Sequence, residues 1–347
     1  MTYRMKCQLT VAGVVLLAAS LTAILPAADA GSPAATQTAT APTALEITWV
    51  RKTAAAAWCR RDSMGEVVFD GKMWLLGGYT PGRINDVWCS ADGVDWTCVT
   101  KAAAWPERNL PCSVVFNNRM WLFGGFAKEG KASYNDIWCS RDGKRWDLAA
   151  EHAPWSPRGA AGAAVFDGKL WITGGFDYSD FKHNSEVWCS VDGKEWRQVT
   201  ANAPWPPRAM HGCVIFDGKL WIVGGGEYNT AFPANTKTDY GDVWSSSDGK
   251  NWRQVTAAAA WPARRFHGCV VYDNKIWVLG GYHQGNSNDV WFSSDGKTWA
   301  QATSPQQWSI RHEPACLVFK GSLWVLGGFG DTLFIKDQAS LNFLGKG

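Results

Sequence analysis

Short apolar runs separated by polar turns recur along the chain at intervals of about fifty residues. The clearest copy spans residues 166–175, Phe-Asp-Gly-Lys-Leu-Trp-Ile-Thr-Gly-Gly, and its closing glycine pair is found six times. The pairs are Gly77-Gly78, Gly124-Gly125, Gly174-Gly175, Gly224-Gly225, Gly280-Gly281 and Gly327-Gly328. Self-similarity at a fixed period indicates that the repeat, rather than any single motif, determines the architecture.

Each repeat contains four short strand patterns. In the first repeat an apolar run over 67–69 leads through the turn Asp70-Gly71 into a second strand that ends at the glycine pair. An Asp-Gly turn tolerates positive φ and favours a type I′ hairpin. A variable loop then leads to a third strand, and a second turn, Asp92-Gly93, returns the chain into a fourth. Four antiparallel strands in about fifty residues are typical of a propeller blade.

The two ends of the repeat array complement each other. The sixth repeat ends after its third strand pattern, near residues 331–337. Residues 46–50, Glu-Ile-Thr-Trp-Val, match the fourth strand of the other repeats. We therefore predict an all-β, six-bladed propeller over residues 46–337, in which residues 46–53 complete the C-terminal blade and close the ring without an unpaired edge. Residues 338–347 are expected to form a C-terminal tail.

The N-terminus resembles a secretory signal. Two basic residues precede an apolar run over 9–25, and Ala28-Asp29-Ala30 offers a cleavage site of the small-x-small type. We expect residues 1–30 to be a signal peptide and residues 31–45 a low-complexity linker. The mature protein is then secreted or periplasmic, monomeric and without a membrane span. A formal net charge of +3 gives no reason to expect nucleic acid as a partner.

Nine cysteines follow the predicted signal peptide. Six of them occupy equivalent places in successive repeats, namely Cys89, Cys139 and Cys189 in one position and Cys213, Cys269 and Cys316 in another. Cysteines repeated in this way are predicted to be small buried side chains rather than disulfide partners or metal ligands. Cys59, Cys98 and Cys112 fall outside the pattern and are expected to be the oxidisable ones.

The glycine pair that closes the second strand, with a tryptophan at a fixed place in the fourth, resembles the kelch repeat. The resemblance extends over about residues 46–337. Kelch propellers include binding platforms, galactose oxidase-like copper enzymes and N-acetylneuraminate epimerases, so this resemblance implies the fold without deciding the function. The turn over residues 90–96, Ser-Ala-Asp-Gly-Val-Asp-Trp, also resembles the Asp-box of sialidases with one residue missing, and that box is a structural turn.

The strand order places the variable loops and the segments before each first strand on one face of the ring, where a ligand site is expected. An arginine precedes every first strand on that face: Arg61, Arg108, Arg158, Arg208, Arg264 and Arg311. Guanidinium groups bind carboxylate, sulfate or phosphate through two hydrogen bonds, so these arginines are candidate ligand-binding residues. An acid also begins every third strand: Asp86, Asp136, Glu186, Asp242, Asp289 and Asp331. Internal ion pairs that lock the blades are therefore the alternative.

A ligand site is asymmetric and should be found where the repeats differ. His211 and His267 share one first-strand position and are candidate ligand-binding residues, with hydrogen-bonded histidines between blades as the alternative. The sixth repeat carries His312 and Glu313 after its arginine, and both are candidate acid/base catalysts. No close His-x-His spacing indicates a metal site, so neither a metal nor a cofactor is expected.

These features together predict a secreted kelch propeller that acts as a binding module at its loop-rich face. The expected ligand is anionic, either an acidic saccharide or an acidic polypeptide. One alternative is a carbohydrate-active enzyme resembling N-acetylneuraminate epimerase, with Glu313 or His312 as the acid/base. A copper oxidase resembling galactose oxidase is disfavoured, because those enzymes have seven blades and a Tyr–Cys crosslink. Whether the protein is an enzyme stays open at this point.

Overall fold

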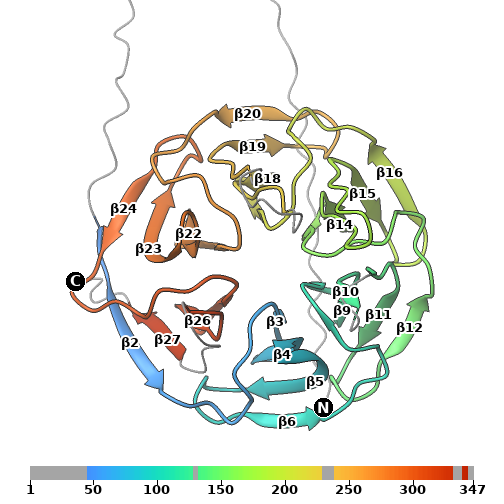
Figure 1. The fold of residues 1–347 in the computed structure, drawn as a ribbon, viewed down its shortest axis with the longest axis horizontal. Helices are drawn as coiled ribbons and strands as arrows, with labels where there is room; N and C mark the ends of the chain where they lie inside the picture. The colour runs from blue at the N-terminus through green and yellow to red at the C-terminus, as the bar shows by residue number, and fades with distance from the viewer. Residues whose placement is uncertain (1–44, 128–131, 229–237, 331–337, 343–347) are drawn as a thin grey trace, which may run out of the picture. The chain divides into compact units, whose positions relative to one another are not determined.

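The computed structural model describes residues 45–127, 132–228 and 238–330 and the backbone of residues 338–342. All of them belong to one compact unit, Ala41–Gly347. Every regular element in these ranges is a β-strand, and the strands are arranged in sheets around a ring, which confirms the predicted all-β propeller (Figure 1). Within the described ranges, no helix is long and apolar enough to cross a membrane. The predicted signal peptide and linker lie outside the described residues.

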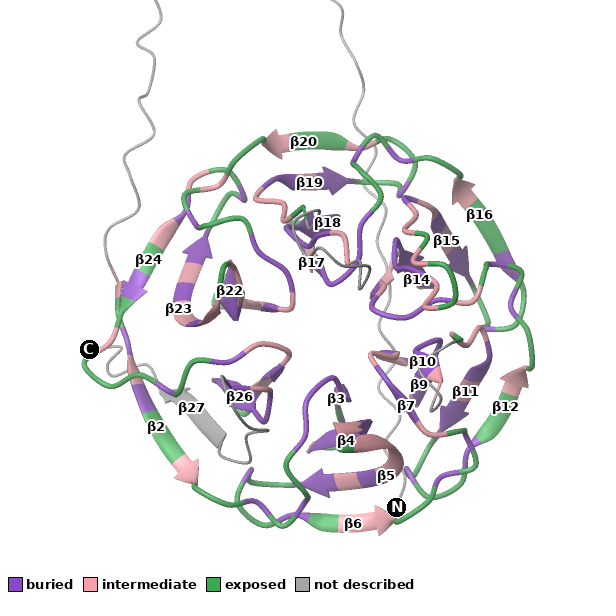
Figure 2. Cartoon of the chain, viewed as in Figure 1, coloured by how far each residue is buried: buried purple, intermediate pink, exposed green. Residues whose placement is uncertain are grey.

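The third repeat shows how a blade is built. It forms β13 (Gly162–Phe166), β14 (Lys169–Thr173), β15 (Val187–Ser190) and β16 (Trp196–Thr200), paired antiparallel in chain order. β14 is buried along most of its length because it lies inside the blade and faces a neighbouring blade on each side. β16 lies at the outer rim and is less buried than β14, with two exposed and two intermediate residues among its five (Figure 2).

Five blades are each built from one continuous repeat, and we number them by that repeat. Blade one contains β3 (Gly65–Phe69), β4 (Lys72–Thr80), β5 (Gly82–Ser90) and β6 (Thr97–Thr100), extended by the short strands β7 (Arg108–Asn109) and β10 (Phe126–Ala127). Blade two contains β8 (Cys112–Phe116), β9 (Arg119–Phe123), β11 (Ile137–Ser140) and β12 (Asp147–Ala150). Blade four contains β17 (Gly212–Phe216), β18 (Lys219–Val223), β19 (Val243–Ser246) and β20 (Arg253–Thr256). Blade five contains β21 (Gly268–Tyr272), β22 (Lys275–Tyr282), β23 (Asn286–Ser293) and β24 (Ala300–Thr303).

The remaining sheet, which we call the composite sheet, joins the two ends of the described chain. Its strands are β25 (Ala315–Phe319), β26 (Ser322–Leu326), β27 (Gln338–Asn342) and, at the edge, β2 (Thr48–Thr53). β2 pairs antiparallel with β27. The prediction of six equivalent blades is therefore corrected. The structure has five blades that are each continuous in sequence, and one further sheet built from both ends of the described chain.

Two predicted boundaries at this junction are wrong. The third strand of the composite sheet is β27, which lies in the segment 338–347 that was expected to be a tail. The N-terminal segment is also interrupted, because β1 (Leu45–Glu46) pairs parallel with β24 of blade five before the chain continues as β2. Residues 45–53 therefore pair with two sheets rather than one.

The hairpins and the turns between third and fourth strands have the geometry that their sequences favour. Asp70 and Gly71 both have positive φ, 48° and 67°, as a type I′ turn requires. In the second kind of turn the Ser90 hydroxyl accepts the Gly93 amide hydrogen at 2.8 Å. Asp92 accepts the amide hydrogens of Val94 and Asp95 at 2.8 and 2.9 Å. These contacts make the Ser-x-Asp-Gly segment a structural turn.

The same turns lock neighbouring blades together. Gly296, between β23 and β24, has a φ of +70°, and a Cβ on it would lie 2.1 Å from the Trp221 ring of blade four. Equivalent contacts join Gly93 to Trp324, Gly143 to Trp74, Gly193 to Trp121 and Gly249 to Trp171. Trp221 is itself held by a hydrogen bond from its indole to the Phe216 carbonyl at 2.7 Å. One glycine and one tryptophan thus make a close contact across each of these blade junctions.

We expect Gly296→Ala to destabilise the protein more than Gly218→Ala. Both glycines have positive φ, at +70° and +64°, so both substitutions carry a similar backbone cost of about 1–2 kcal/mol. Only Gly296 faces a tryptophan, because nothing lies within 4 Å of a Cβ at Gly218. The overpacking should add about 1–3 kcal/mol to the loss at Gly296, measured by denaturant unfolding. Equal losses of stability for the two variants would show that the Trp221 ring moves aside at little cost, and would contradict the prediction.

Candidate functional site

The six arginines that precede the first strands are at most 1% exposed. Arg108 is representative: its two terminal nitrogens donate to the Asp136 carboxylate at 2.6 and 2.7 Å, and one of them also donates to the Gly124 carbonyl at 2.8 Å. The other described pairs are Arg61 with Asp86, Arg158 with Glu186, Arg208 with Asp242 and Arg264 with Asp289. The predicted partner of Arg311, Asp331, lies outside the described residues.

This geometry is that of internal ion pairs, not of a ligand site. Each described pair joins residues of the same repeat, so the arginine fixes the start of a blade to its third strand rather than locking neighbouring blades. The acid is held from a second side, since the Trp138 indole donates to Asp136 at 2.7 Å. The expectation that the six arginines bind ligand directly is therefore not supported by their positions.

Two residues after each arginine, the backbone forms a closed ring of hydrogen bonds that we call the annulus. Its residues are Ser63, Leu110, Ala160, Met210, Phe266 and Glu313, all with φ between 49° and 58°. Each amide donates to the carbonyl of the equivalent residue in the preceding sheet, at distances from 2.7 to 3.4 Å. The circuit closes where Ser63 donates to Glu313. Positive φ is unfavourable for these residue types, so the annulus persists because its neighbours hold it in place.

A cavity of about 360 Å³, the mouth pocket, lies against the annulus on the loop-rich side. Its aromatic wall consists of Tyr79, Phe126, Phe176, Tyr178, Tyr228, Phe266 and Phe329. Its polar residues include Asp62, Ser63, Arg83, Asn109, His312 and Glu313. Most of these residues lie one or two positions after a ring arginine or one position after a glycine pair. These positions differ between repeats, so the pocket is asymmetric.

Two carboxyl groups meet in this pocket where the ring closes. The Ser63 hydroxyl lies 2.7 Å from Asp62 and in shorter contact with Glu313. Burial raises the pKa of Asp62 to about 7. Burial, followed by the charge of Asp62, raises the pKa of Glu313 well above its usual range, although Arg265 opposes the shift. A hydroxyl has only one hydrogen to donate, so the pair is best satisfied when it holds a proton.

Two arginines, Arg83 and Arg265, bring positive charge near the mouth pocket, and neither was predicted from the sequence as a site residue. Arg83 lines the pocket, donates to Asn109 at 2.6 Å, and lies over the Tyr79 and Tyr178 rings. Arg265 pairs with Asp239 and lies 4.9 Å from the Tyr282 ring centroid. Arg265 was detectable in principle, because only the fifth repeat has a second arginine after the conserved position of the repeat.

The predicted acid/base candidates His312 and Glu313 both line the mouth pocket. The His312 ring lies 2.6 Å, through Nδ1, from the Asn286 amide oxygen and 5.5 Å from the Phe266 and Phe329 ring centroids. The structure thus brings both candidates together with Asp62 and Ser63. Their catalytic role stays a prediction.

His211 and His267 lie deeper, in a narrower cavity of about 200 Å³ that Glu66 also lines. His211 contacts the Thr173 hydroxyl of blade three at 3.0 Å. Burial lowers the pKa of each histidine to about 3, so both are neutral. For His211 this geometry favours the alternative of a hydrogen-bonded histidine between blades. Neither histidine lines the mouth pocket.

All nine described cysteines are free thiols. Cys269 and Cys316 pack onto glycines of the preceding blade, since a Cβ on Gly212 or Gly268 would lie 2.5 or 2.1 Å from their sulfur atoms. The repeated cysteines are therefore small packing residues. The expectation that Cys112 is oxidisable is wrong, because its thiol is buried and burial raises its pKa. Within the described ranges, no three His, Cys, Asp or Glu side chains are grouped to hold a metal ion.

Comparison with family models agrees with the repeat, the propeller and the glycine pairs. A model described as the KLHDC2/KLHL20/DRC7 Kelch-repeats domain matches residues 67–262, more than half of the chain. The chain belongs to the kelch-repeat family. A second model, the Kelch motif, matches residues 263–306 of this kelch propeller. A search of curated proteins found no match. The kelch propeller is a general protein-interaction fold, so family membership leaves the ligand open.

We expect Arg208→Ala to destabilise this kelch propeller by about 3–5 kcal/mol, because it leaves the Asp242 carboxylate buried without its partner. Arg119→Ala is the control, since its pair with Asp147 is exposed and should contribute less than about 1 kcal/mol. Denaturant unfolding at pH 7 measures both. A loss at Arg208 as small as that at Arg119 would contradict the structural role of the buried pairs.

The carboxyl pair should make stability fall as the pH rises. A carboxyl whose pKa is higher in the folded than in the unfolded state stabilises the fold fully below the unfolded pKa and loses that contribution through the folded pKa. For Asp62 this window runs from about pH 4 to about pH 7. Asp62→Asn should therefore flatten the pH dependence of the unfolding free energy across the window. Parallel curves for the variant and the wild type would refute this assignment.

Proposed function

We propose that this kelch propeller is a binding module whose ligand enters the mouth pocket. The observation that carries the proposal is the convergence of non-repeating residues there. The ring arginines, the glycine pairs and the junction tryptophans recur in the blades and maintain them. Asp62, Arg83, His312 and Glu313 do not recur, yet they lie around one cavity. Its volume of about 360 Å³ is in the range of small-ligand and side-chain pockets.

The chemistry of the pocket supports a ligand with a basic or hydrogen-bond-donating inner end. Asp62 and Glu313 offer acceptors in this pocket, and Phe176 and Phe266 line the same pocket with apolar surface. A lysine or arginine side chain of a partner polypeptide fits this arrangement, because its methylene groups pack on aromatic rings while its charge reaches the carboxyl pair. This proposal departs from the anionic ligand expected from the ring arginines, whose charges are neutralised within the blades.

An acidic ligand is the second candidate, and one observation supports it. Arg83 lines the pocket, and Arg265 acts on Glu313 from the side. An acidic saccharide could then meet Arg83 while Glu313 or His312 exchanges protons, as an enzyme resembling N-acetylneuraminate epimerase would require. Export of the protein, whether secreted or periplasmic, is part of the proposal and rests on the signal-like residues 1–30.

The test is a binding screen with ligands sorted by charge. We expect peptides centred on lysine or arginine to bind the full-length protein, and the double variant Asp62→Asn/Glu313→Gln to weaken that binding at least tenfold. Peptides centred on norleucine or glutamate serve as matched ligands, and Lys169→Ala, on the opposite face, serves as the control variant. Binding can be measured by titration calorimetry.

The remaining outcomes separate the candidates. Binding of N-acetylneuraminate that is lost in Arg83→Gln, with mutarotation lost in Glu313→Gln, would favour the enzyme instead. If basic peptides bind the wild type and the double variant equally, the mouth pocket is not their site and the proposal fails.

A further inference from the structure

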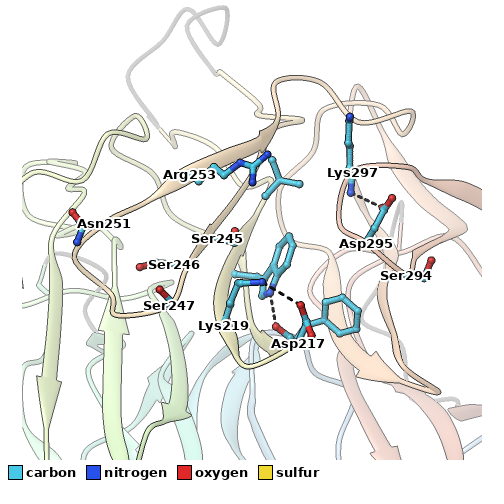
Figure 3. A pocket seen from close by; sticks show the side chains of 13 residues that line it. Asp217, Lys219, Ser245, Ser246, Ser247, Asn251, Arg253, Ser294, Asp295 and Lys297 are labelled. Atoms are coloured by element: carbon cyan, nitrogen blue, oxygen red, sulfur yellow. Dashed lines mark hydrogen bonds and ion pairs between the residues drawn. The ribbon is translucent and has the colours of Figure 1, made fainter. Parts of the chain in front are cut away.

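A second hollow lies on the opposite face of the ring, at the junction of blades four and five. This groove has a volume of about 550 Å³ and is separate from the mouth pocket. Blade four contributes Lys219, Ser245 and Arg253 from three successive strands, and blade five contributes Ser294 and Lys297 from one turn. Figure 3 shows Arg253 and Lys297 on opposite sides of the groove.

The groove differs from the equivalent place in blade two. There Arg119 donates to the Cys139 sulfur at 3.4 Å and pairs with Asp147 at 3.1 Å. The strand registers put Ser245 at the position of Cys139 and Arg253 at the position of Asp147. In blade four a serine hydroxyl therefore stands where blade two has a cysteine thiol, and an arginine stands where blade two has an aspartate that pairs with Arg119.

The two carboxylates that line the groove are already engaged. Asp217 pairs with Lys219 at 3.1 Å. Asp295 accepts the amide hydrogens of Lys297 and Thr298 at 2.8 and 2.7 Å, and contacts the Ser293 hydroxyl at 2.9 Å. These contacts tie Asp217 to Lys219 and Asp295 to its own turn, so neither carboxylate pairs with the Arg253 guanidinium.

The donors of the groove are less engaged than its acids. Ser245 is only 7% exposed, yet its hydroxyl has no hydrogen-bond partner among the residues that the structure describes. Across the same described ranges, the Arg253 guanidinium likewise has no ion-pair partner, and its side chain is exposed. The Ser245 hydroxyl therefore has donor capacity left for a ligand in the groove.

We propose that this groove binds a tetrahedral oxyanion, a sulfate or phosphate group, carried on a ligand of about the size of a monosaccharide. The Arg253 guanidinium offers two parallel donors to such a group, and the Ser245 hydroxyl donates from the floor. Lys297 adds positive charge from blade five. The groove is far larger than an inorganic ion and lies in the range of small-molecule sites, so the ion's carrier fills the rest.

The experiment is titration calorimetry of the full-length protein with glucose 6-sulfate, glucose 6-phosphate and glucose. We expect both esters to bind and glucose to fail. Arg253→Gln should weaken binding at least tenfold, and Ser245→Cys, which introduces the residue found at this position in blades one to three, about three- to tenfold. Arg197→Gln is the matched control, because Arg197 lies at the same position of blade three beside Cys189.

Preference between the two esters identifies the source of the oxyanion, and either preference supports the site. Unchanged thermal unfolding of the variants shows that a loss of binding is local. The proposal is overturned if neither ester binds, if glucose binds equally well, or if Arg197→Gln weakens binding as much as Arg253→Gln. The last result would show a diffuse attraction to arginines on this side of the ring.

Discussion

Each blade depends on a guanidinium that water does not reach. Arg208 donates to both oxygens of Asp242 and to the carbonyls of Gly224 and Pro206. A buried charge costs several kcal/mol unless such partners are present, so the entry of the blade, its glycine pair and its third strand must form together. The glycine is needed as well, because Gly224 has a φ of +57° and a Cβ on it would crowd the Arg264 carbonyl at 3.2 Å. The recurring Arg, Gly-Gly and acid are thus one structural unit.

Acids of the same repeats neutralise the repeated arginines. The residues that can contact a ligand are therefore those that follow the arginines in the sequence. The annulus fixes the backbone at these places, while the side chains differ from sheet to sheet. Asp62 directly follows its ring arginine, at the position that Asn109 occupies in the next repeat. Glu313 lies two residues after its ring arginine, at the position that Met210 occupies in another repeat. The scaffold is therefore rigid and symmetric, and the pocket that it presents is neither charged evenly nor shaped evenly.

Much of this fold can be predicted from the sequence, because strand patterns, turn residues and glycine pairs repeat with constant spacing. The composite sheet was harder to place. Its third strand, β27, lacks the tryptophan that marks this strand in the other repeats, so the pattern pointed to an earlier segment. The spacing of the arginines also could not distinguish a role in ligand binding from a role in internal ion pairs. The mouth pocket was only half visible, because Ser63 and Glu313, 250 residues apart, meet when the ring closes. Arg83 lies near the start of β5, in the stretch between the glycine pair and the third-strand tryptophan that differs from repeat to repeat.

The annulus has an electrostatic consequence for the pocket that rests on it. Its peptide dipoles all point the same way around the circuit, each amide toward the preceding sheet. Vectors that follow one another around a closed loop cancel in the plane of the loop, unlike the aligned dipoles of a helix, which add. The tangential components of these six bonds therefore leave no net in-plane field at the axis. The potential above the annulus is then determined mainly by side chains, so the Asp62 and Glu313 side chains tune it above a backbone circuit that contributes little.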